Sequence, residues 1–313
     1  MASAFELTIL GSSSATPTAN RNTTAQLLNV AERFFLIDCG EATQIQLRKY
    51  KIRFQRINHI FISHLHGDHY LGLMGLLSSF HLLGRINPIH IYSPSGLKEI
   101  ITIQMNFSGT NLCFETVWHE LDTENPKIIF EDKILSVETI ILNHRVPCCG
   151  FIFREKEREF SINKEQAIFY GVPLTQMANV KSGQDAVLND GTIIKNALIT
   201  RGKQKARSYA FCSDTRFDDR VIQGVKGVDL LYHEATFMHD LLERAKQTYH
   251  TTALEAGRVA RLAKVWKLII GHFSARYVDL NPLLAEAKTE FESTFLGEDG
   301  AIFNIPEQPF GRN

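Results

Sequence analysis

Short runs of apolar residues recur along the chain, and most of them end in glycine, aspartate or histidine. Apolar runs of this length, bounded by turn-forming residues, predict buried β-strands. Each run leads into a small flexible loop or into a residue that can bind a metal or move a proton. This placement predicts a sheet whose strand ends converge on one site. The runs are Phe5–Leu10, Phe34–Ile37, Ile60–Ile62, Ile140–Leu142, Ala210–Cys212, Leu230–Tyr232 and Leu268–Ile270.

Helical patterns occupy the gaps between these runs. The segment Tyr70–Leu83 is apolar on more than one face, which predicts a well-buried helix. Thr252-Ala253-Leu254-Glu255 fits a capping box, in which a threonine hydroxyl and a glutamate carboxylate satisfy free amides at a helix start. No repeat of fixed period is present, which excludes a solenoid. The capped helix is expected to bury Leu254, Val259, Leu262 and Ala263.

One stretch, from about Glu155 to Arg207, differs in composition because its apolar density falls and charges crowd both of its ends. Within it, Asn163 is expected to cap a short helix that stops at Gly171. Asn189-Asp190-Gly191 lies between two short apolar runs and predicts a hairpin. We expect an insertion that protrudes from the main domain, with structure of its own but too few apolar residues for a separate core.

Composition sets the broad class of the protein. The 313 residues correspond to one large domain or two small ones at roughly 100–200 residues per domain. Hydrophobic residues make up 44% and charged residues 22%, an ordinary globular composition that argues against a disordered chain. Lys and Arg number 34, as do Asp and Glu, so the formal net charge is zero. This balance excludes a uniformly basic nucleic-acid binder, while a local basic patch stays open.

Targeting and redox signals point to the cytoplasm. No apolar run approaches the roughly 18–20 residues that cross a bilayer. The first residues lack the basic and then apolar layout of a signal peptide. The number of cysteines is odd and none forms a Cys-x-x-Cys pair, which favours reduced thiols over a disulfide scaffold. These cysteines are Cys39, Cys113, Cys148, Cys149 and Cys212.

The densest chemical signal is Ser63-His64-Leu65-His66-Gly67-Asp68-His69, which follows a predicted strand. In extended backbone, residues two apart point the same way, so His64 and His66 can bind one ion together. Asp68 and His69 follow a glycine that lets the chain turn, and they can address a second ion nearby. Zinc suits imidazole nitrogens combined with carboxylate oxygens. We interpret the segment as a metal site rather than a chance cluster of surface histidines.

A two-metal site needs more ligands, and other predicted strands end in suitable residues. His144, Asp214 and His272 each follow an apolar run. Taken alone, each has an ordinary interpretation as a capping or core residue, but their shared placement favours metal binding. Two zinc ions about 3.5–4 Å apart would activate a bridging water and stabilise both oxygens of a displacement at phosphorus.

These motifs together resemble ribonuclease Z, a branch of the metallo-β-lactamase superfamily that trims precursor tRNA at its 3′ end. The spaced His-x-His-x-Asp-His run with distant His, Asp and His resembles the superfamily, and further segments resemble this branch. The resemblance spans Gly11 to about Tyr277. The branch segments are Asp38-Cys39-Gly40-Glu41-Ala42-Thr43-Gln44, Ser213-Asp214-Thr215-Arg216, His233-Glu234-Ala235-Thr236-Phe237 and Gly271-His272-Phe273-Ser274-Ala275-Arg276-Tyr277.

The resemblance implies a fold and a set of site residues. The fold is an α/β structure, the αββα sandwich of the metallo-β-lactamase fold, as a single domain over residues 1–313 with a flexible, tRNA-binding arm inserted at 155–207. It also implies Asp68 as general base, and Glu234 and His250 as the pair that assists the leaving 3′ oxygen. The expected ligands are His64, His66 and His144 for one zinc ion, Asp68, His69 and His272 for the other, and Asp214 as the bridge.

Two segments are expected to contact substrate by the same resemblance. The segment from Pro17 to Asn22 resembles the family's Pro-x-Lys-x-Arg-Asn loop, with Pro17, Arg21 and Asn22 kept and Ala19 in place of the Lys. Ala19 lacks the ammonium group of that lysine. We therefore expect the difference to affect any discrimination that depends on the ammonium group, such as sparing tRNA that already carries CCA. In the inserted arm, cations suited to phosphate contacts are Arg201, Lys203, Lys205 and Arg207.

The leading hypothesis is a zinc-dependent endoribonuclease that acts on precursor tRNA as a cytoplasmic homodimer. Its cut leaves a 3′-hydroxyl on the tRNA and a 5′-phosphate on the trailer. The metal core alone also fits a phosphodiesterase for small diesters or cyclic nucleotides, although the basic insertion argues against this. A non-catalytic RNA-binding protein with a decayed site is disfavoured because every expected ligand is present. Such ligands accept manganese as well as zinc.

Overall fold

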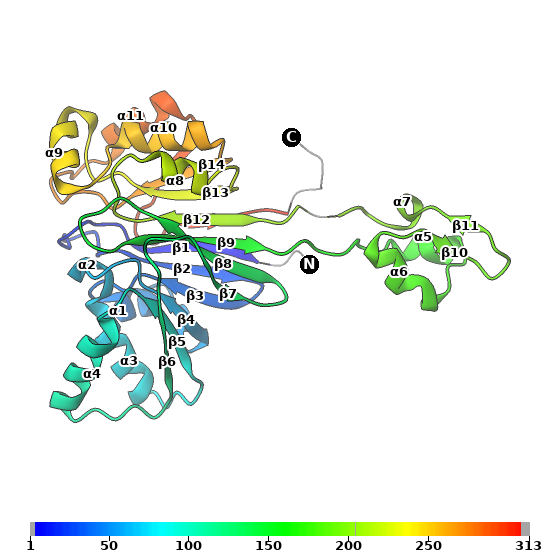
Figure 1. Cartoon of the computed structure of the whole chain (residues 1–313), viewed down its shortest axis with the longest axis horizontal. Helices are drawn as coiled ribbons and strands as arrows, with labels where there is room; N and C mark the ends of the chain where they lie inside the picture. The colour runs from blue at the N-terminus through cyan, green and yellow to red at the C-terminus, as the bar shows by residue number, and fades with distance from the viewer. Residues whose placement is uncertain (1–3, 204, 308–313) are drawn as a thin grey trace. The chain divides into compact units, whose positions relative to one another are not determined.

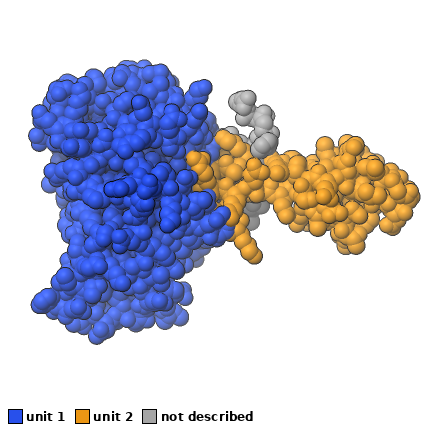
Figure 2. Space-filling model, viewed as in Figure 1, with its two compact units in different colours: residues 1–132, 136–153, 208–305 blue, residues 133–135, 154–207, 306–313 orange. Residues whose placement is uncertain are grey.

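The computed structural model describes residues 4–203 and 205–307 and divides into two compact units (Figure 2). Unit 1 comprises Met1–Asp132, Ser136–Phe153 and Ser208–Ile305. Unit 2 comprises Lys133–Leu135, Arg154–Arg207 and Pro306–Asn313. No helix within the described ranges is long and apolar enough to cross a membrane.

The first large sheet of unit 1 has the strand order β16-β1-β2-β3-β4-β5-β6. Strands β16, β1, β2 and β3 pair antiparallel, and β3 to β6 pair parallel. The bounds are β1 Phe5–Gly11, β2 Ala25–Val30, β3 Arg33–Ile37, β4 Ile57–Phe61, β5 Ile89–Ser93, β6 Thr116–Glu120 and β16 Ile302–Asn304.

The second large sheet has the order β15-β14-β13-β12-β9-β8-β7. Strands β12 to β15 pair parallel, while β7 and β8 pair antiparallel. Parallel strands place their carboxyl ends at the same sheet edge, which is where the loops after β12 and β14 emerge. The bounds are β7 Ile128–Glu131, β8 Leu135–Ile141, β9 Cys149–Glu155, β12 Ser208–Cys212, β13 Leu230–Glu234, β14 Lys267–Gly271 and β15 Thr294–Leu296.

Helices cover the outer faces of both sheets in unit 1 (Figure 1). One apolar core joins the first sheet to α1, α3 and α4, and another joins the second sheet to α8, α10 and α11. This is the predicted αββα sandwich. The unit 1 helices are α1 Thr43–Lys49, α2 Gly67–Tyr70, α3 Gly72–Leu82, α4 Leu97–Ser108, α8 Asp219–Gly224, α9 Leu242–Thr248, α10 Ala253–Ala263 and α11 Asn281–Glu290, with 3₁₀ helices at Phe54–Arg56 and His239–Leu241.

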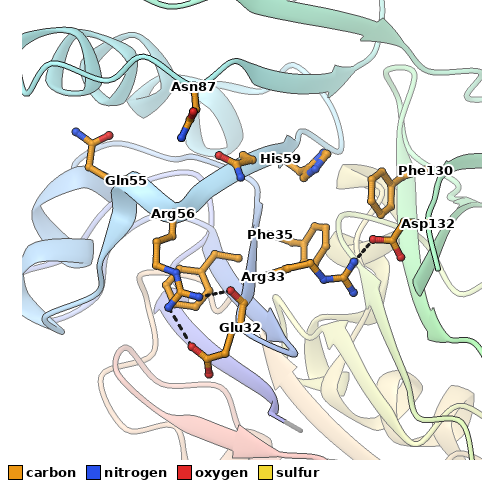
Figure 3. A pocket seen from close by; sticks show the side chains of 11 residues that line it. Glu32, Arg33, Phe35, Gln55, Arg56, His59, Asn87, Phe130 and Asp132 are labelled. Atoms are coloured by element: carbon orange, nitrogen blue, oxygen red, sulfur yellow. Dashed lines mark hydrogen bonds and ion pairs between the residues drawn. The ribbon is translucent and has the colours of Figure 1, made fainter. Parts of the chain in front are cut away.

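Aromatic side chains and one ion pair join the two sheets. The ring of Phe35 on β3 lies 5.8 Å from those of Phe130 on β7 and Phe153 on β9. Beside them Arg33 forms an ion pair with Asp132, across a cavity of about 280 Å³ (Figure 3). In the same cavity, Arg56 is paired with Glu32 (Figure 3). Each of these arginines therefore has its own carboxylate partner.

The strands predicted from apolar runs are all present, within a few residues of their predicted bounds. The helix predicted over residues 70–83 is confirmed as α3, Gly72–Leu82, which directly follows the short helix α2. The capping box is confirmed: the Thr252 hydroxyl accepts from the Glu255 amide, and the Glu255 carboxylate accepts from the Thr252 amide. Of the apolar residues expected to be buried in α10, Val259 and Ala263 are buried, but Leu254 is only half-buried and Leu262 is 46% exposed, since the helix packs through its alanine-rich face.

Unit 2 contains a small apolar core, and the expectation that this stretch lacks one is wrong. Each short element contributes only one or two buried side chains, so no local periodicity reveals the core. Asn163 caps α5 as predicted, and the predicted hairpin is formed by β10 and β11. The elements are α5 Lys164–Phe169, α6 Met177–Ser182, α7 Asn196–Ile199, β10 Ala186–Val187, β11 Ile193–Ile194 and a 3₁₀ helix at Leu174–Gln176. The core residues are Ala167, Val172, Val180, Ala186, Ile194 and Ile199.

Candidate metal centre

Loops that follow four strands bring seven histidines and aspartates together in unit 1. The Ser63–His69 segment follows β4 of the first sheet. The loops after β8, β12 and β14 of the second sheet supply His144, Asp214 and His272. The site therefore lies where both sheets end, and every expected metal ligand is part of it.

The first group of donors centres on a ring nitrogen of His66. Its Nδ1 lies 3.0 Å from Nε2 of His64 and 3.2 Å from Nε2 of His144. Oδ2 of Asp214 lies 3.5 Å from Nε2 of His64 and 3.8 Å from Nε2 of His144. Four donor atoms on four side chains thus converge, as a tetrahedral cation site requires.

The second group shares Asp214 with the first. Oδ2 of Asp68 lies 3.3 Å from Nε2 of both His69 and His272. Oδ1 of Asp214 lies 3.2 Å from Nε2 of His272 and 3.5 Å from Nε2 of His69. The two oxygens of this one carboxylate consequently face different groups of histidines, which is the arrangement of a bridging ligand.

The outer ring nitrogens of four of these histidines contact oxygen atoms. Such contacts fix the ring orientation and the tautomer of a metal-binding histidine. The shortest of these contacts is made by His69, whose Nδ1 lies 2.7 Å from Oδ2 of the buried carboxylate of Asp38. The other three pairs are His64 Nδ1 with Ser63 Oγ at 3.1 Å, His144 Nδ1 with the Tyr249 carbonyl at 3.0 Å, and His272 Nδ1 with Thr236 Oγ1 at 2.9 Å.

The chemistry of these groups fits divalent cations. Burial and the neighbouring His69 lower the pKa of His64 to about 3, so its ring is a neutral donor. Burial alone would raise the pKa of Asp214, but the surrounding histidines outweigh it and hold the pKa well below its ordinary value. Nε2 of His69 is buried without a hydrogen-bond partner. An unpartnered buried nitrogen beside an ionised carboxylate is what a cation would satisfy.

Two site residues have left-handed backbone. Asp38 has φ of 56° and His272 has φ of 58°. Such conformations are uncommon for residues other than glycine, although Asp and His tolerate them better than most. At Asp38 the conformation accompanies hydrogen bonds from both the amide and the hydroxyl of Ser63 to its carboxylate. The site is held by backbone geometry as well as by side-chain packing.

A carboxylate–histidine pair lies beside the two groups. Nδ1 of His250 lies 2.9 Å from Oε1 of the fully buried Glu234. Oε2 of Glu234 accepts hydrogen bonds from the amide and hydroxyl of Thr236. Burial lowers the pKa of His250, but the Glu234 and Asp214 carboxylates outweigh it and raise the pKa to about 9. His250 therefore carries a proton at neutral pH and can donate it.

These residues open into a cavity of about 570 Å³, which is large enough for a nucleotide but not for a folded RNA. Its walls include Asp68 and His250 as well as the cationic side chains of Arg145 and Arg244. The lining of the cavity therefore combines ionised carboxylates with cationic side chains.

Comparison with known proteins identifies the family. The chain matches a family model described as "Anti-Pycsar protein Apyc1" over residues 5–169. It is 48% identical over 301 residues to the ribonuclease Z of Bacteroides fragilis (strain YCH46), covering 96% of this chain and 99% of the relative. The ribonuclease Z of Cytophaga hutchinsonii is 47% identical over 307 residues, covering 97% of each chain. The chain belongs to the ribonuclease Z family.

A solved structure agrees with this assignment. Human tRNase Z, short form, matches with a TM-score of 0.70 and 28% identity, covering 96% of this chain and 99% of that chain. The predicted family and the predicted metallo-β-lactamase fold are thereby confirmed. Membership of the ribonuclease Z family also confirms the predicted enzyme class, a phosphodiester-hydrolysing endoribonuclease.

The loop that resembles the Pro-x-Lys-x-Arg-Asn pattern of ribonuclease Z is fastened to the edge of the cavity. The buried guanidinium of Arg21 donates to the backbone carbonyls of Tyr277, at 2.8 Å, and Ser274, at 3.3 Å. The amide and side chain of Asn22 both donate to Asp299 Oδ2, at 2.8 and 3.0 Å. Both residues thus hold the loop in place through contacts within the protein.

At the tip of the same loop, the residues point outward. Pro17 and Ala19 are exposed. The tip, rather than Arg21, is the part of the loop that a substrate can reach. Ala19 therefore stands at an accessible position, where a longer cationic side chain would extend into solvent.

The expected arm cations fall into two classes in unit 2. Arg201 and Lys205 are exposed, and Lys203 lies 3.2 Å from the Glu157 carboxylate. Arg207, in contrast, is 4% exposed and donates to both carboxylate oxygens of Glu155 at 2.7 and 2.8 Å. Its charge is matched inside the protein, so Arg207 has a structural role that its place in a basic run does not reveal.

The sequence alone does not identify Asp38, Thr236 or Asp299 as functional residues. Asp38 and Thr236 lie inside segments that carry the resemblance to ribonuclease Z, and Asp38 also ends an apolar run. That position at a strand end is a usable signal. Asp299 gives no such signal, because its partner Asn22 is 277 positions away in the chain.

Proposed function

We propose that this protein is a metal-dependent endoribonuclease that removes the 3′ trailer from precursor tRNA. Cleavage leaves a 3′-hydroxyl on the tRNA and a 5′-phosphate on the trailer. Membership of the ribonuclease Z family and the similarity to human tRNase Z support the substrate. The observation in the structure that carries most weight is Asp214, whose two oxygens face two separate groups of histidines at 3.2–3.8 Å.

The expected ligands would hold two divalent ions, zinc in our proposal, with manganese as an accepted alternative. When bound, such a pair supplies Lewis-acid activation of the phosphodiester and of the attacking water. The group around His66 would hold one ion and the group around Asp68 the other, and Asp214 directs one carboxylate oxygen toward the histidines of each group.

Asp68 acts on the attacking water. Burial alone would raise the pKa of Asp68, but contacts with His69 and His272 outweigh it and hold the pKa below its ordinary value. The carboxylate is therefore ionised at neutral pH and lines the cavity. It accepts a hydrogen bond from the water, orients it toward phosphorus and takes up its proton as the new P–O bond forms.

His250 acts on the leaving group. Its Nδ1 is occupied by Glu234, so the proton on Nε2 is the one available to the cavity. As the bond between phosphorus and the 3′ oxygen breaks, Nε2 donates this proton to the oxygen and yields the 3′-hydroxyl. His250 also lies close to Asp214 and His272, in a third group of donor side chains. Its raised pKa favours the proton donor over a third cation ligand.

Residues of the arm and of the loop tip contact the tRNA outside the cavity. The exposed arm cations Arg201 and Lys205, together with the partly buried Lys203, bind phosphates of the tRNA, and the arm is flexible. The loop tip at Pro17 meets the tRNA end. The arm also exposes Phe169, an aromatic side chain suited to stacking against a base, between the exposed aliphatic side chains of Ile168 and Leu174.

The proposal extends to assembly and location. We propose a homodimer, because unit 1 exposes large apolar side chains on and beside α3 and α4 that a second copy would cover. We also propose a cytoplasmic location, where the free cysteines stay reduced. Light scattering of the purified protein measures the assembly. The exposed apolar residues are Leu82, Leu83, Ile86, Ile103 and Phe107.

The deciding experiment incubates zinc-loaded protein with a precursor tRNA that bears a short 3′ trailer. We expect one cut near the discriminator base, and loss of that cut in Asp68→Ala and His250→Ala. A parallel reaction uses a small phosphodiester. Hydrolysis of the small diester without any cut in the tRNA would favour the phosphodiesterase alternative. A cut that survives equally in both variants would contradict the proposed roles.

A further inference from the structure

The outer nitrogen of His66 is the exception among the histidines of the first group. Nδ1 of His66 faces His64 and His144, so Nδ1 is the atom directed at the candidate cation. Its other nitrogen, Nε2, faces the guanidinium of Arg145, with both Nε and Nη2 at 3.4 Å. An oxygen atom occupies the corresponding position at His64 and His144, whereas His66 has a cation there.

This arrangement has a chemical consequence once Nδ1 binds a cation. A neutral imidazole that coordinates through one nitrogen carries its proton on the other, so Nε2 becomes a donor. A guanidinium has donors only. His66 and Arg145 then present N–H groups to each other with no acceptor between them. An oxygen bearing negative charge is the group that would satisfy both.

Arg145 has no carboxylate of its own to supply that oxygen. In the part of the chain that the structure describes, no ion pair joins Arg145 to an acid, and the side chain is exposed at the cavity wall. The carboxylates nearest His66, those of Asp68 and Asp214, are candidate metal ligands. Arg33 and Arg56, in contrast, each have an acidic partner (Figure 3).

We propose that His66 Nε2 and the Arg145 guanidinium form a subsite for a backbone phosphate of the RNA that flanks the bond being cut. The subsite lies on the far side of the His66 ring from the candidate cation, so it is separate from the position of the scissile phosphate. It binds a non-bridging phosphate oxygen and fixes the register of the strand. This inference rests on the proposed function, since the RNA supplies the phosphate.

The test measures binding rather than turnover. The ligand is a precursor tRNA whose scissile 3′ oxygen is replaced by methylene, so that it binds without being cut. Zinc-loaded wild-type protein is compared with Arg145→Gln, which removes the charge from an exposed side chain. Arg244→Gln is the matched control, because Arg244 is an exposed arginine of the same cavity without a contact to His66. Zinc content verifies that each variant keeps its metals.

We expect Arg145→Gln to weaken binding about tenfold or more, the effect of one lost charge-assisted hydrogen bond. The slope of log Kd against log salt should fall by about 0.7, the value for one phosphate contact on a single strand. Arg145→Lys should keep that slope but recover only part of the affinity, since a point charge cannot reproduce the planar fork.

Two modified RNAs locate the phosphate. Each carries a neutral methylphosphonate, one immediately upstream and one immediately downstream of the cut site. We expect one of them to bind wild-type protein as weakly as the unmodified RNA binds Arg145→Gln, and to lose nothing further in that variant. The other should still lose affinity in the variant. This pattern assigns the subsite to the tRNA side or the trailer side.

Three outcomes would overturn the subsite. They are that Arg145→Gln binds like the wild type, that it loses no more affinity than Arg244→Gln, and that it loses affinity equally on both methylphosphonate RNAs. In the last two cases, Arg145 acts through the general field of the cavity. If the wild type cuts unmodified precursor tRNA, such results remove the subsite alone. A wild type that neither binds nor cuts the tRNA overturns both proposals.

Discussion

The carboxylate of Asp38 lies 2.7 Å from Nδ1 of His69, and both side chains are fully buried. The same carboxylate accepts hydrogen bonds from Ser63. Asp38 thus links the start of the metal segment to one of its ligands, and it fixes the His69 ring with Nε2 directed at the candidate cation.

The Asp38→Asn variant should bind metal more weakly. An amide in place of the carboxylate makes the His69 ring a poorer donor, and loss of such a partner typically costs 10–100-fold in metal affinity. Competition with a chromogenic chelator measures zinc affinity directly. Asp219→Asn, at an exposed position of α8, is the control and should leave affinity unchanged. Equal affinities of both variants and wild type would contradict a positioning role for Asp38.

The Glu234→Gln variant should shift the alkaline limb of the pH profile for tRNA cleavage to lower pH. Glu234 raises the pKa of His250 against the opposing effect of burial, so removing the charge lowers that pKa from about 9. The proton on His250 is then lost at a lower pH, and cleavage falls earlier as pH rises. His250→Ala should show a low rate without that limb. An unshifted limb in Glu234→Gln would assign it to another group.

The Ala19→Lys variant should change the preference between tRNAs with and without CCA. Position 19 is exposed at the loop tip, so a lysine fits without disturbing the contacts of Arg21 and Asn22. The measurement is the ratio of cleavage rates on two trailer-bearing substrates, one with and one without CCA at the processed end. We expect the variant to discriminate against CCA more strongly than the natural chain. An unchanged ratio would show that position 19 has no part in this choice.

The Glu155→Gln variant should destabilise unit 2 by about 1.5–3 kcal/mol, because it weakens the charge-assisted hydrogen bonds that the buried Arg207 donates to the Glu155 carboxylate. Urea unfolding measures this loss, and Glu159→Gln is an internal control from the same segment. Burial raises the pKa of Glu155, but the hydrogen bonds from Arg207 and Arg158 outweigh it and lower the pKa below its ordinary value.

The sign of the corresponding pH effect follows from that shift. A carboxyl group with a lowered pKa in the folded state contributes stability above its unfolded pKa, about 4.3 for Glu. The contribution is lost as the pH falls from there through the folded-state pKa. The wild type should therefore lose stability in this acid range more steeply than Glu155→Gln. Parallel acid curves for the two proteins would contradict a stabilising ion pair.

The sequence predicts those parts of the molecule in which one short segment contains the metal donors or the apolar run of a strand. The segment from Ser63 to His69 gathers donors within a few positions, and His144, Asp214 and His272 each end an apolar run. Parallel strands bring such ends together at one sheet edge. Strand β2, which lies between β1 and β3, is not evident from the sequence, since Ala-Gln-Leu-Leu-Asn-Val lacks a clear apolar run. Its Gln26 is buried because Tyr209, far away in the chain, supplies a hydrogen-bond partner.

The remaining site residues depend on contacts between distant segments. The hydrogen bonds of Asp299 to Asn22 and Gln46 cross more than 250 positions, so no local pattern indicates them. Arg207 lies in a run of cations, and only its contact with Glu155 distinguishes it from the exposed members. Arg145 beside His66 is a pairing of the same kind, formed by residues 79 positions apart.

The wide separation of the metal-centre residues along the sequence also affects when the centre can form during synthesis of the chain. Its residues run from His64 to His272, and the loop at Asn22 is fastened by Asp299. A ribosome must therefore synthesise the chain through His272 before one polypeptide contains all of these donors. An interrupted translation product that ends before His272 has an incomplete donor set. The order of residues along the chain thus delays assembly of the donor set until His272 has been synthesised.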